Sequence, residues 1–287
     1  MLEKESVLKT SFAKKRIYAV AGASDPVIKQ TVDLALQNDL GEFLLFGPGE
    51  LDYDEQKVKV FKAHSDEEAA KLAVHAVRTG KADVLVKGFV PTATVLRAVL
   101  AKETGLRTDK LLSQIAMFEL PNYPKPLFIT DCAMNIAPTL EEKKQITLNA
   151  IEAVRKFGVS SPKVVFLSAV EQVTEKMPST VDAAELVKFV KETYPEIEAA
   201  GPLAFDAAIS KEAALHKGIE NVAAGDADII IVPNIETGNA LYKSLVYFGN
   251  AHVASSVIGA KAPVVISSRS DSAENKLLSF LLTGRMV

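Results

Sequence analysis

The sequence predicts an α/β protein that folds as two α/β domains with mainly parallel sheets. Short apolar runs alternate with longer amphipathic stretches along the chain, which is typical of β-α-β units whose sheet is covered on both faces. The alternation restarts after residue 139 with a strong helix start. The 287 residues provide enough chain for one large domain or two smaller ones.

Strands are predicted from short apolar runs, and helices from apolar residues spaced three and four apart. Residues 179–193 show the helical spacing, with Ala183, Leu186, Val187 and Val190 on one face. The expected strands are residues 16–21, 42–46, 84–86, 127–130, 164–167, 229–232 and 264–266. The expected helices are residues 26–38, 66–79, 91–102, 140–157, 179–193, 238–248 and 272–282.

The restart near residue 139 also marks a join between the two domains. Thr139 and Glu142 have the spacing of a capping box, in which the Thr139 hydroxyl accepts from a free backbone N–H and Glu142 reaches back. The helix that follows is expected to end at Gly158. We place one join at residues 135–139 and the return crossing near Gly259.

Composition excludes several classes of protein. Hydrophobic residues make up 48% of the chain and charged residues 24%, with a formal net charge of -3, so neither nucleic acid nor an anionic membrane is the expected partner. No apolar run approaches the roughly 20 residues that span a bilayer, and the N-terminal residues lack the apolar core of a signal peptide. The single cysteine, Cys132, forms no intrachain disulfide, so we expect a reducing, cytoplasmic location.

The strongest local signal for chemistry is residues 267–272, Ser-Ser-Arg-Ser-Asp-Ser, between the last expected strand and the last expected helix. A helix N terminus presents unpaired N–H groups to an anion, and Arg269 adds a cation with forked donors. The alternative is that Asp271 or Ser272 only caps the helix, with Glu274 completing a capping box. Capping alone leaves the arginine and the serines before it unexplained.

Three further segments place polar residues after apolar runs. Asp206 lies in residues 201–210, and its alternative role is a helix start or a surface carboxylate. Asn239 follows the turn residue Gly238, which either admits a ligand close to the backbone or simply forms the turn. The third segment, residues 87–97, contains Thr92, Thr94 and Arg97, whose alternative roles are a helix cap and a surface ion pair.

The remaining reactive side chains give no recognisable motif. Cys132 has no histidine at a family spacing, and most lone cysteines are buried and inert. No metal site is expected, because the four histidines are scattered without ligand spacing. The sequence also contains neither a dinucleotide-binding Gly-x-Gly-x-x-Gly nor a P-loop.

Taken in order, these segments resemble the phosphate acetyl/butyryltransferase family over essentially the whole chain. The most specific matches are residues 226–243 (DADIIIVPNIETGNALYK), residues 201–208 (GPLAFDAA) and the pair Ser268-Arg269. Residues 19–23, 87–97 and 131–133 also fit.

The resemblance implies two α/β domains like those of isocitrate and isopropylmalate dehydrogenases, with the active site in the interdomain cleft. Residues 1–136 and 260–287 would form the first domain, and residues 137–259 an inserted second domain. It also implies a homodimer and the reaction acyl-CoA plus phosphate giving acyl phosphate plus CoA. CoA is then a substrate, and no tightly bound cofactor is expected.

The resemblance assigns roles to individual residues. Ser268 and Arg269 would bind phosphate, and Ser268 would also donate to the oxyanion. Asp206 or Asp271 would act as base or orient the thiol. In the acetyl enzymes a glycine follows the Ser-Arg pair and an aspartate lies further on, and this chain has Ser270 and Asn275 at those places. This form looks closer to the butyryl branch. The further substrate-binding candidates are Arg97, Thr92, Ser267, Ser270, Asn239 and Asn275.

The expected activity is therefore transfer of a butyryl or branched short-chain acyl group by direct attack, without a covalent enzyme intermediate. A phosphate acetyltransferase is the nearest alternative. A non-catalytic protein that binds CoA or acyl phosphate is an alternative from another class, kept open by Asn275. A metal- and nicotinamide-dependent dehydrogenase would need clustered metal-binding aspartates and a cofactor loop, and the sequence shows neither.

Overall fold

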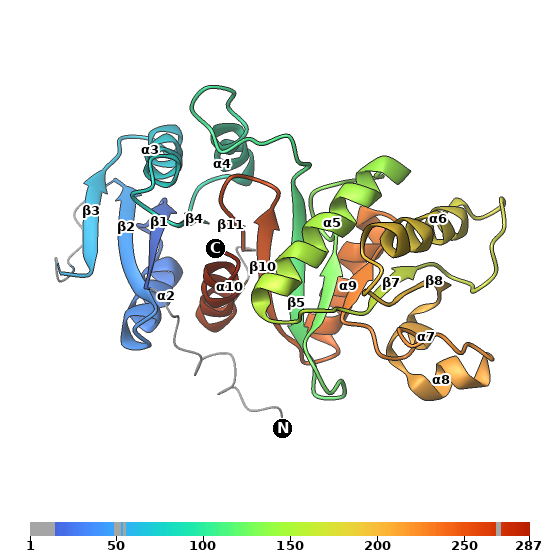
Figure 1. Ribbon diagram of the computed structural model, residues 1–287. Helices are drawn as coiled ribbons and strands as arrows, with labels where there is room; N and C mark the ends of the chain where they lie inside the picture. The colour runs from blue at the N-terminus through green and yellow to red at the C-terminus, as the bar shows by residue number, and fades with distance from the viewer. Residues whose placement is uncertain (1–14, 49–52, 54–55, 268–270) are drawn as a thin grey trace. The chain divides into compact units, whose positions relative to one another are not determined.

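The computed structural model describes residues 15–48, 53, 56–267 and 271–287. The described chain packs as two compact units (Figure 1). The first unit contains the residues up to Lys110 together with Ala254–Val287, and the second contains Leu111–Val253. The second unit begins at Leu111 rather than near residues 135–139, and it ends at Val253 rather than near Gly259. It begins earlier because the strands within residues 113–130 pair with the other strands of that unit.

The first unit contains a mainly parallel sheet. β1 (Arg16–Ala21) pairs in parallel with β2 (Gly41–Gly47) and with β4 (Val84–Lys87). β2 pairs in parallel with β3 (Val58–Lys62), and β4 with β11 (Val264–Val265). β10 (His252–Ile258) is antiparallel to β11. The carboxyl ends of β1, β4 and β11 therefore lie side by side at one edge.

Helices cover the first unit's sheet in two pairs, α2 (Pro26–Gln37) with α10 (Ala273–Arg285) and α3 (Asp66–Arg78) with α4 (Thr92–Val99). Tyr18, Phe43 and Phe280 stack at the core, with ring centroids 5.3 Å and 5.4 Å from that of Tyr18. The Tyr18 hydroxyl donates to the Phe280 carbonyl oxygen, so this contact fixes α10 against β1.

The second unit contains a run of paired strands. β6 (Leu127–Thr130) is antiparallel to β5 (Ser113–Glu119) and parallel to β9 (Ile229–Ile231). β7 (Val164–Leu167) is parallel to both β9 and β8 (Ala199–Leu203). The expected α/β fold with mainly parallel strands is confirmed.

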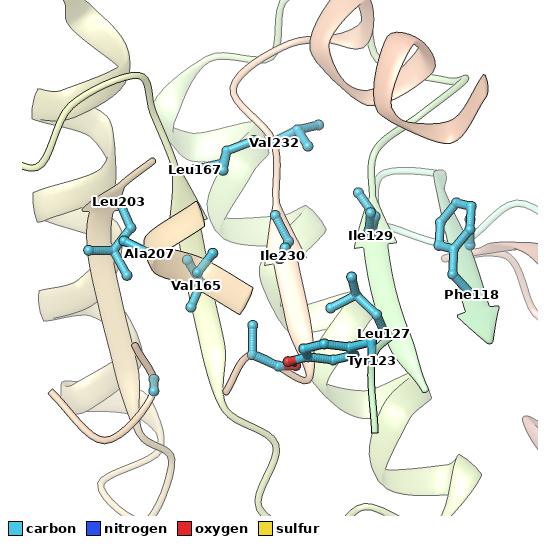
Figure 2. Close-up of a cluster of buried hydrophobic side chains, with 14 of the residues drawn as sticks. Phe118, Tyr123, Leu127, Ile129, Val165, Leu167, Leu203, Ala207, Ile230 and Val232 are labelled. Atoms are coloured by element: carbon cyan, nitrogen blue, oxygen red, sulfur yellow. The ribbon is translucent and has the colours of Figure 1, made fainter. Parts of the chain in front are cut away.

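Five helices belong to the second unit: α5 (Leu140–Phe157), α6 (Pro178–Thr193), α7 (Phe205–Ile209), α8 (Lys211–His216) and α9 (Ile235–Tyr247). The capping box of Thr139 and Glu142 is confirmed, and α5 ends at Gly158 as expected. The labelled buried side chains of Figure 2 come from β5 to β9 and from α7, except that Tyr123 lies between β5 and β6 and Val232 directly follows β9. Phe118 meets Tyr242 of α9 edge to face, with ring centroids 5.4 Å apart, so α9 packs on this cluster.

The start of α9 differs from the expected one. The helix begins at Ile235 rather than Gly238, because the Asn234 side chain accepts from the Thr237 N–H and caps it there. Gly238 consequently lies inside the helix. A Cβ at this position would lie 2.5 Å from the Asp131 carbonyl oxygen, so the glycine allows α9 to pack closely on residues 131–132.

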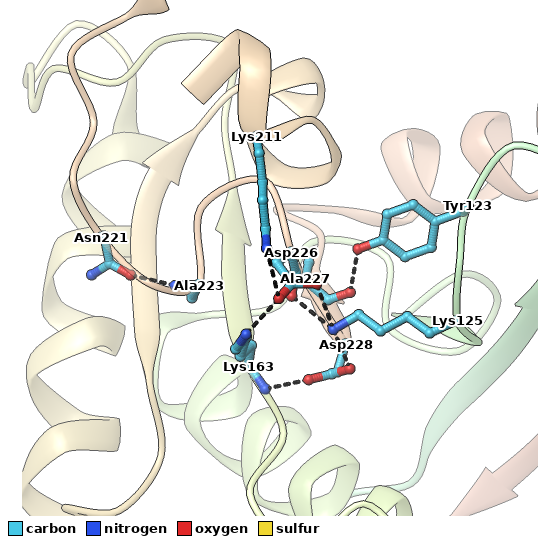
Figure 3. A network of polar contacts seen from close by, with 9 residues as sticks. All are labelled: Tyr123, Lys125, Lys163, Lys211, Asn221, Ala223, Asp226, Ala227 and Asp228. Carbon is cyan, nitrogen blue, oxygen red and sulfur yellow. Dashed lines mark hydrogen bonds and ion pairs between the residues drawn. The ribbon is translucent and has the colours of Figure 1, made fainter. Parts of the chain in front are cut away.

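A network of charged side chains stabilises the amino ends of three strands in the second unit (Figure 3). Asp226, which precedes β9, accepts from Lys163 and Lys125, and Asp228 accepts from Lys125 Nζ at 2.6 Å. Burial raises the pKa of Asp226, but the two lysines more than offset it and lower that pKa to about 2. Tyr123 donates to the Ala227 carbonyl oxygen at 2.7 Å. Asp226 therefore joins β6, β7 and β9 at their amino ends, on the opposite edge from the usual ligand sites of such sheets.

Among the described residues, no helix is long and apolar enough to cross a membrane.

Candidate functional site: a lysine-lined pocket

The carboxyl ends of β1, β4 and β11 carry the polar turns of the first unit. β1 leads through Gly22 to Asp25, which caps α2 by accepting from two backbone N–H groups. β4 ends at Lys87, and Ser267 follows β11. Because these three strands are neighbours, their turns converge at one place in the sheet. Ligands of open α/β sheets bind at such an edge.

A compact pocket of about 60 Å³ lies there. Two lysines enter it from different elements, Lys87 from the end of β4 and Lys276 from the first turns of α10. The remaining lining residues are Asp25, Val27, Ile28, Gly88, Phe89 and Ser267.

Both lysines of this pocket are buried. Lys87 is 5% exposed, Lys276 is 4% exposed, and Ser267 beside them is 8% exposed. Lys87 Nζ donates to the Gly88 carbonyl oxygen at 3.2 Å, and Lys276 Nζ donates to the Asp271 carbonyl oxygen at 3.0 Å. Burial lowers the pKa of Lys276, while the charges of Asp271 and Asp25 oppose that shift. Main-chain carbonyl oxygens thus help to hold both lysine head groups in the pocket.

Two glycines position the pocket's main chain. Gly22 has a φ of +78° and donates its N–H to the Phe46 carbonyl oxygen, which ties the turn after β1 to the end of β2. A Cβ on Gly88 would lie 2.3 Å from the Gly22 carbonyl oxygen and 2.7 Å from that of Ala21. The absence of side chains at these two positions lets the turns after β1 and β4 touch, which sets where Lys87 lies.

The residues expected near the C terminus fall partly within this site. Ser267 lines the pocket, and Asp271 contributes the carbonyl oxygen that accepts from Lys276. Asn275 lies one residue before Lys276, and its N–H donates to the Ser272 hydroxyl that caps α10. Ser268, Arg269 and Ser270 lie outside the described residues.

Thr92 and Arg97 belong to the same unit but not to the lysine pocket. Thr92 is an exposed residue at the start of α4. Arg97 lines a larger cavity of about 480 Å³ between α3 and α4, together with Lys71, His75 and Thr94. Arg97 therefore lies outside the lysine pocket.

Asp206 and Asn239 lie in the second unit. Asp206 lies in the first turn of α7 and accepts from Lys217 Nζ at 2.8 Å and from the Ala207 N–H at 2.8 Å. These bonds, the Lys217 bond foremost, lower the pKa of Asp206, so its carboxylate stays ionised at neutral pH. Asn239 is exposed on α9, and its amide donates to the Cys132 carbonyl oxygen at 3.5 Å.

Cys132 does not have the surroundings of a nucleophile. Its side chain is 1% exposed, and burial raises the pKa of the thiol, which the charge of Asp131 raises further. In the part of the chain that the structure describes, no group of three or more His, Cys, Asp or Glu side chains is arranged to hold a metal ion.

The residue that sequence reasoning missed is Lys276. A signal was present, because Ala273, Lys276, Leu277 and Phe280 share the i, i+3, i+4, i+7 spacing of a buried helix face. A lysine at a core-facing position is unusual and directs attention to a buried charge.

The chain resembles known proteins over most of its length. A family model described as "Phosphate acetyl/butaryl transferase" matches residues 57–284. A probable phosphate butyryltransferase of Bacillus subtilis (strain 168) is 46% identical, over 97% of this chain and 96% of the relative. A phosphate acetyltransferase of Thermotoga maritima is 38% identical, over 97% of this chain and 98% of the relative.

Solved structures show the same fold. A branched-chain phosphotransacylase from Enterococcus faecalis V583 is 41% identical and superposes with a TM-score of 0.87, covering 94% of this chain and 98% of that one. A 4-hydroxythreonine-4-phosphate dehydrogenase from Klebsiella pneumoniae superposes with a TM-score of 0.60 at 11% identity, which shows likeness of fold alone.

Proposed function

The chain belongs to the phosphate acetyl/butyryltransferase family, and from that premise we propose that it transfers a short-chain acyl group between CoA and inorganic phosphate. The reaction is acyl-CoA plus phosphate giving acyl phosphate plus CoA. Butyryl or branched short-chain groups are favoured over acetyl, because the relatives from Bacillus subtilis and Enterococcus faecalis are named for those groups. The observation in the molecule that supports this function is the small pocket lined by Lys87 and Lys276.

The residues of the C-terminal turn are proposed to contact the phosphate. Ser268 and Arg269 follow Ser267, which lines the pocket, and they precede the N terminus of α10. Forked guanidinium donors and a helix N terminus both favour a phosphate oxygen. Ser270 and Thr92 remain candidates for contacts with the substrates, as does Asn275, whose amide has no basic atom to accept the thiol proton.

Three residues are proposed for CoA rather than for the pocket's anion. Arg97, in its separate cavity, offers a cation to another phosphate group of the coenzyme. Asp206 and Asn239 are candidates from the second unit. The bond to Lys217 lowers the pKa of Asp206, and an ionised carboxylate suits a residue that orients the thiol of CoA. Asp271 is the alternative residue for this role.

A thiol-release assay tests this function. Purified protein is given butyryl-, isobutyryl-, isovaleryl- or acetyl-CoA with and without inorganic phosphate, and free thiol is followed. We expect thiol release only when phosphate is present, and faster with butyryl or branched substrates than with acetyl-CoA. Faster release with acetyl-CoA would instead identify a phosphate acetyltransferase. Binding of CoA without any turnover would contradict the proposal and favour the non-catalytic alternative.

We also propose that the protein works in the cytoplasm as a homodimer, with the outer face of α9 as the contact. Tyr247 and Phe248 at the end of α9 are 66% and 88% exposed. Glu236, Ala240, Lys243 and Tyr247 follow the i, i+4, i+7, i+11 spacing of one helix face. Antiparallel pairing of two α9 helices about a two-fold axis near Ala240 brings Glu236 of each copy level with Lys243 of the other.

A charge exchange on α9 tests this contact. Glu236→Lys or Lys243→Glu alone places like charges together across the axis and should weaken the dimer by about 3- to 10-fold. The double variant restores opposite charges and should return the dissociation constant close to that of the natural chain. Sedimentation equilibrium measures the dimer, with Lys191→Glu on α6 as control. A double variant weaker than both single variants would exclude this pairing.

A further inference from the structure

The cavity of about 480 Å³ between α3 and α4 lies within the first unit and shares no lining residue with the lysine pocket. The two helices pack against each other (Figure 1). Sites for small molecules usually have volumes of roughly 300–1,000 Å³, so this cavity is large enough to hold one. The proposed contact between Arg97 and a CoA phosphate accounts for one lining residue, and the others need an explanation of their own.

Basic side chains line this cavity from both helices. Lys71 and His75 lie one turn apart on α3, and Arg97 lies in the last turn of α4. Within the described part of the chain, the head groups of Lys71 and Arg97 form no hydrogen bond or ion pair. Glu67 is the one acidic residue among the described residues that line the cavity. The wall therefore carries more positive than negative charge, which suits an anionic ligand.

The helix dipoles explain part of this arrangement. A cation in the last turn of a helix interacts favourably with the dipole, and both His75 and Arg97 lie in last turns. Lys71 lies in the middle of α3, where that interaction has faded. Its position on the same cavity as Arg97 is instead what a shared anion requires, because phosphate oxygens accept from several donors at once.

The rest of the wall is mostly apolar. Its apolar members are Leu72, Val74, Ala98 and Ala101. Val74 is 1% exposed, so it lies at the base of the cavity, and the two alanines leave room that larger side chains would fill. A free phosphate ion would leave this apolar surface uncovered. The wall therefore suits a ligand that joins a phosphate group to a flat, largely apolar body.

We propose that this cavity binds a purine nucleotide, with Lys71 and Arg97 contacting a phosphate group and the base covering the apolar wall. A nucleotide supplies both the anion and an apolar ring of suitable size, whereas a short-chain carboxylate would fill only part of the space. The same chemistry occurs in the phosphorylated adenosine of CoA and in free adenine nucleotides. The inference goes beyond the proposed acyl transfer, because it concerns binding alone.

The test is calorimetric titration with the adenosine bisphosphate that forms the nucleoside end of CoA. Lys71→Met and Arg97→Met are each expected to weaken binding about 5- to 30-fold, because each removes a charge-assisted hydrogen bond. Ala98→Leu fills part of the cavity and should weaken binding at least about 5-fold. Lys81→Met, an exposed lysine of the same unit, is the control and should bind within about 2-fold of the natural chain. Thermal unfolding at an unchanged temperature shows that each variant is folded.

Displacement experiments separate the two sources of this chemistry. Displacement by CoA, and at least about 10-fold weaker displacement by dephospho-CoA, would show that the cavity holds the nucleoside end of the coenzyme. Binding of ADP that CoA does not displace would show that it holds a free nucleotide. Either result supports the site, even if the chain releases no thiol and the proposed acyl transfer fails.

Three results would overturn the inference. The first is that the natural chain binds neither the bisphosphate nor ADP. The second is unchanged binding in Lys71→Met, Arg97→Met and Ala98→Leu, which would place the nucleotide elsewhere. The third is inorganic phosphate bound as tightly as the bisphosphate, because the apolar wall would then contribute nothing.

Discussion

Replacing Arg269 by alanine is expected to lower turnover of butyryl-CoA with phosphate by about 100- to 1,000-fold. Removal of one preset donor to a developing anion has an effect of this size. Arg269 lies two residues after Ser267, which lines the lysine pocket, and we propose it as a phosphate ligand. Steady-state thiol release over a range of phosphate concentrations measures the change.

Two further variants show whether the effect belongs to Arg269 itself. Arg269→Lys keeps the charge but loses the forked donors, and it should recover only part of the rate. Arg78→Ala removes an exposed arginine at the end of α3 and should leave turnover within about 2-fold, as surface changes usually do. Full turnover in Arg269→Ala would exclude it as a phosphate ligand and leave the lysines as the main cations.

The fold was predictable where residues along the chain repeat one pattern. Continuous apolar runs marked β1, β2, β4, β6, β7 and β9, and the capping box marked the start of α5. β3 was missed because its residues after Val58 are exposed, so it lacks an apolar run. β8 was missed because Gly201 and Pro202 within it are typical of turns.

Two other strands were not predicted because they contain buried polar residues. β10 contains Ser255 and Ser256, and β5 begins with Ser113 and Gln114, all of them buried. The Ser255 N–H donates to the Ser279 hydroxyl of α10, a contact between residues 24 apart in sequence. Sequence patterns do not show which buried polar groups find such partners in the folded chain.

The candidate site was predictable in its strand ends but not in its charges. The turn after β11 was expected to bind an anion, and Ser267 lines the pocket found there. Lys276 was missed because a lysine in a helix is normally exposed, whereas the packing of α10 within the first unit leaves this one 4% exposed. Asp226 is the opposite example. It begins the segment that resembles the family most specifically, but its ion pairs with Lys125 and Lys163 stabilise the second unit.

The second large effect concerns Gly88, where the fold and the site meet. Gly88→Ala is expected to lower the free energy of unfolding by about 3 kcal/mol, because overpacking against main-chain atoms that cannot rotate away has a cost of this size. The new Cβ would lie 2.3 Å from the Gly22 carbonyl oxygen and 2.7 Å from that of Ala21. Urea unfolding followed by circular dichroism measures the loss.

Gly80→Ala separates this clash from the general cost of replacing a glycine. Gly80 has a φ of +73° and open space around its Cβ position, so its replacement adds backbone strain of about 1–2 kcal/mol without a collision.

Because the turns after β1 and β4 must separate to admit the new methyl group, Gly88→Ala should also move Lys87 and weaken phosphate binding, whereas Gly80→Ala should not. Equal stability losses in the two variants, with phosphate binding intact in both, would show that contact between these turns does not position the lysine. A larger loss in Gly88→Ala accompanied by weaker phosphate binding would show that the same close approach of two turns stabilises the first unit and shapes its anion pocket.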